Sequence, residues 1–287
     1  IVNHHLLWIG VISLIDRKVI ESEKTLFLFT VGYTVFSLNL NKIALLRNAR
    51  GENNPSLEEY ANKAIDLGVD GLTLHPRPDH RHATSEDVIS LGKICKERDV
   101  EFNIEGNPFS EPADPFQGYV NLVNACQPDQ ATLVPDLPNQ ITSDHGWESG
   151  DHDDNLINVI KNLNSLCKNI SISLFVDNLK NNNTNLDSID YALKVGANTI
   201  EIHTGEFAKL IDLNDLTINT KLEELIYGAK DKDLMVNAGH DLNLINLPHL
   251  VSIGGVNEVS IGHAIVVDAL NYGFEDTIKR YIGVIKG

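Results

Sequence analysis

The sequence predicts a single (β/α)8 barrel, in which eight parallel strands alternate with helices around one core. Three observations support this fold class. Short apolar runs alternate with amphipathic stretches from residue 34 onward, eight such runs occur, and polar residues follow each of them. We therefore predict one catalytic domain over residues 34–287 and an N-terminal extension, residues 1–33, outside the barrel.

The predicted strands are short and apolar, and several are rich in β-branched residues. They cover residues 34–40, 71–74, 100–104, 130–134, 169–176, 198–202, 234–236 and 258–261. The stretches between them repeat apolar residues at helical spacing. These predicted helices cover residues 56–67, 85–97, 115–125, 155–167, 185–195, 219–230 and 264–285.

Capping residues mark several of the helix ends. Ser56 precedes Glu59 by three positions, and Thr84 precedes Asp87 in the same way, which is the spacing of an N-terminal capping box. Gly68 follows the first of these helices and suits its C-terminal exit. The alternation of helix and strand therefore has local chemical support.

The N-terminal extension contains two apolar runs, at residues 6–15 and 26–36, with charged residues between them. Neither run reaches the roughly 18 apolar residues that a membrane-spanning helix needs. No basic n-region or small-residue cleavage site of a signal peptide is clear. We predict that the extension does not belong to the catalytic fold.

The formal net charge is −17, which argues against nucleic acid or an anionic membrane as a partner. An anionic ligand would have to be bound by local cationic groups. The three cysteines are far apart and form no Cys-x-x-Cys pair, so we expect reduced thiols in a cytoplasmic protein.

Polar residues at the carboxyl ends of the predicted strands would meet on one face of the barrel. In barrels of this class that face carries the active site. The candidates on it are Asn39, Asn41, His75, Arg77, Glu105, Asp136, Thr142, Asp177, Glu201, His203, Asn237, His240, Gly262 and His263.

Arginines and glycines on this face indicate an anionic substrate. Arginines follow the first two strands, and a guanidinium group matches phosphate or carboxylate oxygens bidentately. Glycine-histidine pairs follow the last two strands, where backbone N–H groups of barrels often bind phosphate. The residues concerned are Arg47, Arg50, Arg77, Arg81, Gly239, His240, Gly262 and His263.

Acidic and basic side chains are also predicted on this face of the barrel. Glu105, His75 and His240 are candidates for proton transfer, and Glu201 could stabilise a cationic intermediate. Two structural alternatives stay open at this point: Glu105 could cap a helix or pair with an arginine, and Glu201 could simply pack among polar groups inside the barrel.

The histidines also allow a metal-dependent hydrolase. Such barrels usually begin from a His-x-His pair at a strand end, whereas the second position after His75 is Arg77, a cation. His80 and His82 have the spacing but lie further along the loop. We therefore predict no metal and no organic cofactor, and keep a metal-dependent phosphohydrolase as the alternative.

Longer motifs resemble one known family, pyridoxine 5'-phosphate synthase, from about residue 37 to 285. The motifs are Asn39-Leu-Asn-Lys-Ile-Ala-Leu-Leu-Arg-Asn-Ala-Arg-Gly51, His75-Pro-Arg-Pro-Asp-His-Arg-His82, Glu101-Phe-Asn-Ile-Glu-Gly106, Thr132-Leu-Val-Pro-Asp136, Ser171-Ile-Ser-Leu-Phe-Val-Asp177, Glu201-Ile-His-Thr-Gly205, Val236-Asn-Ala-Gly-His-Asp-Leu242 and Val259-Ser-Ile-Gly-His-Ala264. Their length and order make the resemblance specific.

The resemblance implies a reaction and a role for each matched residue. The family condenses 3-amino-2-oxopropyl phosphate with 1-deoxy-D-xylulose 5-phosphate, releasing phosphate and water. It implies His75 and Glu105 as proton acceptors, His240 as proton donor and Glu201 as the group that stabilises the transition state. For the aminoketone phosphate it implies Asn39, Arg50, Asp241, Gly262 and His263, and for the deoxyxylulose phosphate Arg77, His82 and Thr142.

Two positions depart from the common family pattern. Asn41-Lys42 stands where many members carry Asp-His, and Asp241 stands in place of a glycine. These departures suggest, as a second alternative, a phosphometabolite-binding protein that has lost catalysis. The resemblance further implies a homo-octamer in the cytoplasm that acts on small phosphorylated substrates.

Overall fold

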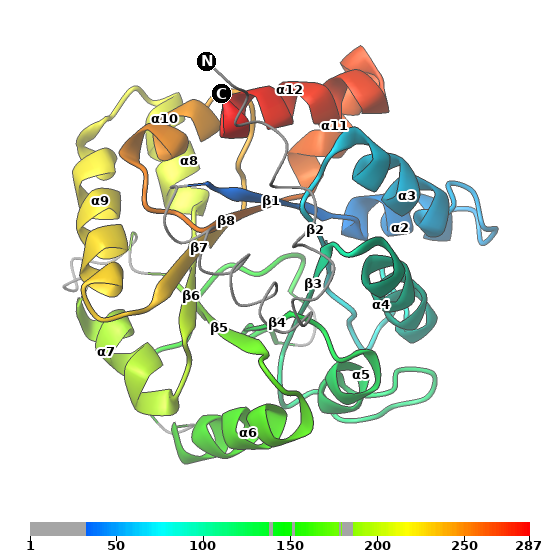
Figure 1. The fold of residues 1–287 in the computed structure, drawn as a ribbon, viewed down its shortest axis with the longest axis horizontal. Helices are drawn as coiled ribbons and strands as arrows, with labels where there is room; N and C mark the ends of the chain where they lie inside the picture. The colour runs from blue at the N-terminus through cyan, green and yellow to red at the C-terminus, as the bar shows by residue number, and fades with distance from the viewer. Residues whose placement is uncertain (1–32, 138–139, 151–152, 178, 180–185) are drawn as a thin grey trace, which may run out of the picture. The chain divides into compact units, whose positions relative to one another are not determined.

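Eight parallel strands close into a barrel in chain order, with helices outside it, in a computed structural model (Figure 1). The structure describes residues 33–137, 140–150, 153–177, 179 and 186–287. The predicted fold class is confirmed. The prediction about the N-terminal extension concerns residues that, apart from Tyr33, lie outside the described part.

The strands agree closely with the predicted ones, and two of them have the predicted bounds. They are β1 (Val35–Asn39), β2 (Gly71–Leu74), β3 (Glu101–Gly106), β4 (Gln130–Leu133), β5 (Ser171–Val176), β6 (Thr199–His203), β7 (Met235–Gly239) and β8 (Glu258–Ile261). Pairing of Val35 with Glu258 and of Leu38 with Ile261 joins β1 to β8 and closes the sheet.

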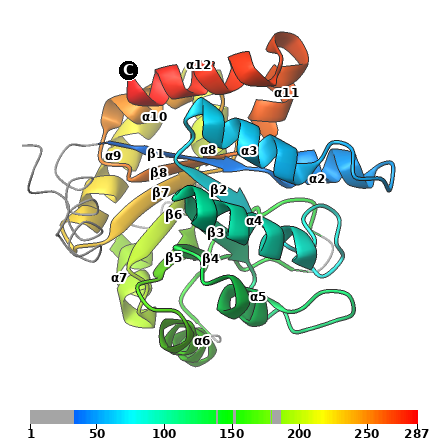
Figure 2. The same cartoon turned by 45° about the vertical axis from the view of Figure 1, so that its right-hand side comes forward.

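The helices surround the strands, as the turned view in Figure 2 also shows. They are α2 (Asn41–Asn48), α3 (Leu57–Leu67), α4 (Ser85–Arg98), α5 (Tyr119–Cys126), α6 (Asp153–Leu166), α7 (Leu186–Val195), α8 (Gly205–Asp212), α9 (Thr217–Lys230), α10 (Leu247–Ile253), α11 (His263–Tyr272) and α12 (Phe274–Lys286).

The predicted caps are present. The hydroxyl of Thr84 accepts a hydrogen bond from the Asp87 N–H, and Asp87 accepts one from the Thr84 N–H, which completes a capping box. Ser56 caps α3 through the N–H of Glu59. Gly68 ends α3 with φ at 100°, a conformation that glycine adopts without strain.

Several helix predictions need correction. The stretch 264–285 is two helices, because Gly273, with φ at 77°, ends α11 and begins α12. The stretch 115–125 becomes helical only at Tyr119, after Gly118 with φ at 87°. Helices α2, α8 and α10 were not predicted, because each has only seven or eight residues and gives a weak periodic pattern.

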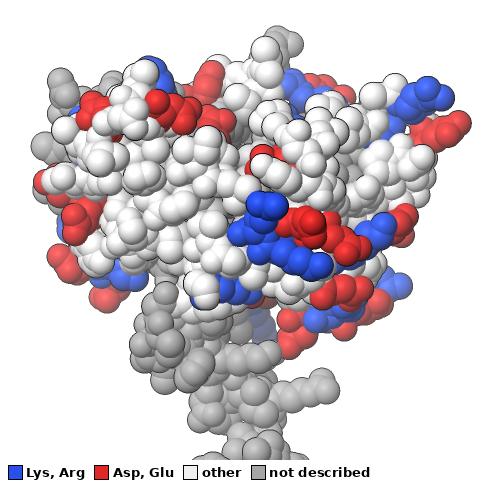
Figure 3. Space-filling model, turned by 90° about the horizontal axis from the view of Figure 1, so that it is seen from above, with Lys and Arg blue, Asp and Glu red and all other residues white. Residues whose placement is uncertain are grey.

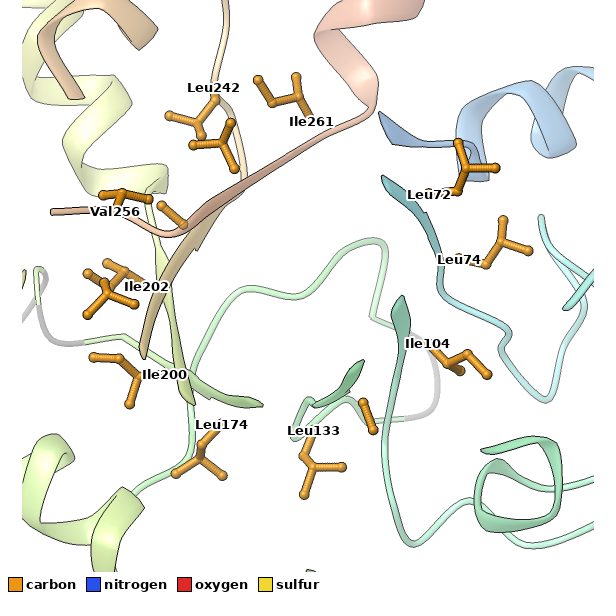
Figure 4. Packing of buried hydrophobic residues seen from close by; sticks show 14 of the residues in the cluster. Leu72, Leu74, Ile104, Leu133, Leu174, Ile200, Ile202, Leu242, Val256 and Ile261 are labelled. Carbon is orange, nitrogen blue, oxygen red and sulfur yellow. The ribbon is translucent and has the colours of Figure 1, made fainter. Parts of the chain in front are cut away.

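The hydrophobic core lies between the strands and the helices. Figure 4 shows Leu72, Leu74, Ile104 and Leu133 on the outer side of their strands, away from the barrel axis. Each of these side chains is fully buried. Because side chains alternate along a strand, the neighbouring residues point into the barrel.

The barrel interior is polar and hydrogen-bonded. Ser37 and Thr73 share a hydrogen bond of 2.7 Å between their hydroxyls. Asn237 donates from Nδ2 to Oε1 of Gln130 at 2.9 Å, across the barrel. The strands therefore present two surfaces: an outer apolar one that packs on helices, and an inner one whose buried polar groups bind each other.

The surface has no separate basic patch on the face shown in Figure 3, where Lys and Arg side chains lie beside Asp and Glu. Within the described ranges, no helix combines the length and the apolar character needed to cross a membrane. All three cysteines are free thiols.

Candidate active site

A cavity of about 610 Å³ opens at the carboxyl ends of the strands. It is lined by every residue to which the family resemblance gives a role except Arg50, whereas four further strand-end candidates, Asp136, Asp177, His203 and Asn237, do not line it. The predicted residues that line it are Asn39, His75, Arg77, His82, Glu105, Thr142, Glu201, His240, Asp241, Gly262 and His263. Residues from six of the eight strand ends, together with the loop after β4, therefore converge on one space, as the barrel topology requires.

Arg50 lies apart from this group. It is exposed in the turn after α2 and does not line the cavity. Arg47, the second-last residue of α2, donates to both carboxylate oxygens of Asp87, with Nη2 at 2.7 Å from Oδ2. Arg47 thus connects α2 to the N-terminus of α4, and its role is structural.

His75 lies between two carboxylates at the end of β2. Its Nδ1 is 3.5 Å from Oε2 of Glu105, and its Nε2 is 2.9 Å from Oδ2 of Asp136. Burial lowers the pKa of His75, but the contacts with Asp136 and Glu105 outweigh burial and raise the pKa above its usual value. Asn41 fixes the backbone here, because its Oδ1 accepts from the His75 N–H at 2.9 Å.

Arg77 and His82 form a cationic and polar wall. Arg77 Nη2 lies 2.6 Å from Oδ2 of Asp136. Within the described part of the chain, Nε of Arg77 and Nδ1 of His82 are buried without a hydrogen-bond partner. Burial, with the positive charge of nearby groups, lowers the pKa of His82 to about 2, so its imidazole is neutral. These two atoms are suited to an incoming anion.

Glu105 lies at the centre of the site. Asn39 donates from Nδ2 to its Oε2 at 3.4 Å, and Ser260 donates from its hydroxyl to Oε1 at 3.5 Å. Together with His75, these contacts connect β1, β2, β3 and β8 at one carboxylate. Glu105 caps no helix, so that structural alternative does not hold.

Glu201 is the central residue of β6, and its side chain is buried inside the barrel. Thr132 donates to its Oε2 at 3.3 Å. Burial, with the nearby charge of Glu105, raises the pKa of Glu201 well above its usual value and favours the neutral acid. Glu201 both packs inside the barrel and lines the cavity, so the two interpretations left open by the sequence are compatible.

His240 and Asp241 have left-handed backbones, with φ of 82° and 56°. The ring of His240 lies 4.8 Å from the ring of His203, centroid to centroid. Burial, followed by the effect of His203, lowers the pKa of His240 to about 4, so its imidazole is neutral at pH 7. The Asp241 carboxylate lies beside Gly205, at the start of α8.

Gly262 ends β8 at a point of close approach. A Cβ on Gly262 would lie 2.9 Å from the backbone oxygen of Asn39, so only glycine fits. The next residue, His263, begins α11. Gly262, His263 and Ala264 line the cavity, so the N-terminus of α11 borders it, and a helix N-terminus favours a bound anion.

Among the cavity residues that the sequence analysis missed, two are charged. Lys209 and Asp212 belong to α8, which was not predicted. The buried residues of that helix, Phe207, Ala208 and Ile211, have helical spacing and were the available signal.

The histidine rings of the loop after β2 contact different partners. The His80 ring packs against Phe116, with centroids 6.2 Å apart, whereas the His82 ring faces His75 at 6.1 Å. In the described ranges, no group of three His, Cys, Asp or Glu side chains is arranged to hold a metal ion.

Fold and site define a class of protein: a barrel enzyme whose cavity brings buried carboxyl and imidazole groups together with a guanidinium group. The chain belongs to the family of the pyridoxal phosphate biosynthesis protein PdxJ, whose model matches residues 36–287. A pyridoxine 5'-phosphate synthase from Cytophaga hutchinsonii is 41% identical over 254 residues, covering 88% of this chain and 99% of that protein. One from Xanthomonas oryzae pv. oryzae is 39% identical over 256 residues, with 88% and 97% covered. The resemblance found in the motifs is confirmed.

Solved structures of other families share the fold alone. Thiamine phosphate pyrophosphorylase from Pyrococcus furiosus is 13% identical with a TM-score of 0.54, covering 89% of this chain and 96% of that one. Tryptophan synthase from M. tuberculosis is 9% identical with a TM-score of 0.57, covering 89% and 94%.

Proposed function

We propose that this protein is a pyridoxine 5'-phosphate synthase, which condenses 3-amino-2-oxopropyl phosphate with 1-deoxy-D-xylulose 5-phosphate. The products are pyridoxine 5'-phosphate, inorganic phosphate and water. Family membership and the names of relatives that share almost their whole length with this chain support this function. The observation that carries it is one cavity in which Glu105, His75, His240 and Glu201 meet Arg77 and His82.

The proton-transfer roles follow the matched motifs. His75 and Glu105 accept protons, His240 donates one, and Glu201 stabilises the transition state. Joining an amine to a ketone removes water, and enolisation, phosphate loss and ring closure each move further protons. Several groups placed on different strands can serve these steps while the substrate stays in place.

The phosphate-binding roles are divided between two sides of the cavity. Arg77, His82 and Thr142 bind the deoxyxylulose phosphate, and the unpartnered Nε of Arg77 and Nδ1 of His82 support this assignment. For the aminoketone phosphate we propose Asn39, Arg50, Asp241, Gly262 and His263. The helix start at His263 supports the second site.

The departures from the family pattern are compatible with activity. Asn41 binds the backbone of His75, a task that an amide oxygen performs as well as a carboxylate. The carboxylate of Asp241 lies beside Gly205, so it can stay clear of a phosphate bound to the backbone. We therefore favour an active synthase over a binding protein that has lost catalysis.

The decisive experiment is incubation of the purified protein with both substrates, with mass detection of pyridoxine 5'-phosphate and measurement of released phosphate. A synthase gives both products in equal amounts, and Glu105→Gln gives little of either. Binding of both substrates without product would indicate the binding protein. Release of phosphate from one substrate alone, abolished by a chelator, would indicate a metal-dependent phosphohydrolase.

We further infer, from the family resemblance, a homo-octamer in the cytoplasm. Light scattering during size-exclusion chromatography would measure the mass of the assembly. A mass close to that of one chain would contradict the octamer.

A further inference from the structure

Asp136 forms close ion pairs with two residues that line the cavity, yet no role follows for it from the matched motifs. It comes three residues after β4, and its side chain is buried. Its Oδ2 lies 2.6 Å from Nη2 of Arg77 and 2.9 Å from Nε2 of His75. Asn107 donates from Nδ2 to the Asp136 backbone oxygen at 2.7 Å and so fixes the residue from behind.

These contacts occupy the groups that the proposed function assigns to the substrate. Arg77 is to bind the deoxyxylulose phosphate, and His75 is to accept a proton. In the structure both face the same carboxylate oxygen. A carboxylate and a phosphate compete for a guanidinium group, because both offer anionic oxygens to the same N–H fork.

The guanidinium group of Arg77 has a hydrogen-bond donor that Asp136 does not use. Its Nε and the Nδ1 of His82 are buried without partners among the described residues. A phosphate dianion has three oxygens and more charge than a carboxylate, so it can satisfy donors that Asp136 leaves unused. The exchange of partners is thus favourable for Arg77.

We propose that Asp136 is a positioning residue that takes the place of the substrate phosphate on Arg77, and that binding of 1-deoxy-D-xylulose 5-phosphate separates it from Arg77 and His75. The proposal rests on the proposed function, which supplies the phosphorylated substrate.

The release changes the protonation of His75. The groups that face His75 are Glu105 from β3, Asp136 from the loop after β4, Arg77 and His82 from its own loop, and His240 from the loop after β7. Burial lowers the pKa of His75, and Asp136 is the first of the groups that raise it. Without that contact the pKa falls, and His75 becomes the free base that its role requires.

The alternative is that Asp136 stays in place and only orients Arg77 for the phosphate. The two cases predict opposite effects of removing its charge. If Asp136 competes with the phosphate, Asp136→Asn tightens phosphate binding. If Asp136 only orients Arg77, the same change weakens it.

The test uses the full chain, with Asp136→Asn and the control Asp144→Asn. Asp144 lies on the same loop, but its side chain is 62% exposed and pairs with His145. Titration calorimetry with inorganic phosphate and with 1-deoxy-D-xylulose 5-phosphate should show about tenfold tighter binding by Asp136→Asn, because the competing state is removed. Asp144→Asn should bind as the wild type does. Unchanged or weaker binding by Asp136→Asn would overturn the proposal.

A second measurement needs no variant. Nuclear magnetic resonance of the His75 ring in the wild type should give a lower pKa when the deoxyxylulose phosphate is bound than in the free protein. A pKa that stays the same or rises on binding would overturn the proposal even if Asp136→Asn failed to fold. Both measurements read binding and protonation, so they are independent of product formation, whose absence would contradict the proposed function instead.

Discussion

Gly239, the last residue of β7, leaves space for the carboxyl group of Glu201 in the middle of β6: a Cβ on Gly239 would lie 2.5 Å from Oε1 of Glu201. Real atoms do not approach so closely, so the glycine is a condition for the position of the carboxylate. Gly239→Ala should displace Glu201 and reduce kcat by about 100-fold, since displacement of a reacting group by about 1 Å has effects of this size. Steady-state kinetics would measure it.

The matched control is Gly283→Ala in α12, where a Cβ would meet no atom within 4 Å. This change should leave kcat unaltered and stabilise the protein slightly, because alanine is favoured over glycine in a helix interior by about 0.5–1 kcal/mol. Wild-type kcat in Gly239→Ala would show that the Glu201 position is not required.

Glu105→Gln should reduce turnover by about 100-fold or more and leave the affinity for phosphorylated ligands near that of the wild type. The amide keeps the size of the side chain but cannot accept a proton in the reaction. Single-turnover rates and equilibrium binding separate the two effects. Glu111→Gln, an exposed position in the loop after the same strand, serves as the control, and equal turnover in both variants would remove Glu105 from catalysis.

Arg77→Ala should weaken binding of 1-deoxy-D-xylulose 5-phosphate by about 10- to 100-fold, the usual effect of losing charge-assisted hydrogen bonds. Binding of the aminoketone phosphate should change much less. Arg280→Ala, on the exposed side of α12, is the control for the loss of one positive charge. Equal loss of affinity for both substrates would argue against two separate phosphate sites.

Arg50 provides a sharper test, because it is exposed and does not line the cavity. If it binds the aminoketone phosphate, the turn after α2 must move toward the cavity when substrate is present. Arg50→Ala should then raise KM for that substrate by about tenfold and leave the affinity for the other substrate unchanged. An unaltered KM would place Arg50 among ordinary surface arginines.

The buried imidazoles predict a loss of stability in acid. The pKa of His240 is about 4 in the folded protein, mainly because of burial, against about 6.5 when unfolded. Its contribution is therefore complete above pH 6.5 and is lost as the pH falls toward 4. His82 acts with the same sign, whereas His75, whose pKa is raised, contributes stability that is lost as the pH rises through its folded pKa.

His240→Asn isolates this contribution, because asparagine does not titrate. The free energy of unfolding in urea should fall less steeply between pH 7 and pH 5 in the variant, by up to about 1.4 kcal/mol per pH unit. A slope equal to that of the wild type would show that His240 titrates alike in the folded and unfolded states.

The barrel was predictable from sequence because its signal is repeated: eight strands, each followed by polar residues. The bounds of β2 and β8 were predicted to the residue, since each run ends sharply at a polar or glycine-containing loop. The short helices α2, α8 and α10 were not, because seven or eight residues complete barely two turns. The break at Gly273 was missed, since apolar periodicity continues on both sides of it.

The site could be predicted as a set of residues but not as a set of contacts. Asp136 was among the strand-end candidates, yet its pairing with Arg77 and His75 depends on the conformation of a loop after another strand. Protonation states also depend on three-dimensional surroundings. His75 has a raised pKa because of Asp136 and Glu105, and His240 has a lowered pKa because of burial and His203. Neither shift could be predicted from the position of the residue in the sequence.

The pairing of β1 with β8 has a consequence for synthesis of the chain. Val35 and Glu258 lie near opposite ends of the barrel domain in the sequence but pair in the structure. Ser260 reaches Glu105 only after this pairing forms. A nascent chain that lacks β8 has neither a closed sheet nor a complete active site. Catalytic activity therefore requires that β8 has been synthesised and has paired with β1. A chain truncated before Glu258 should have no activity, even if the preceding strands and helices fold.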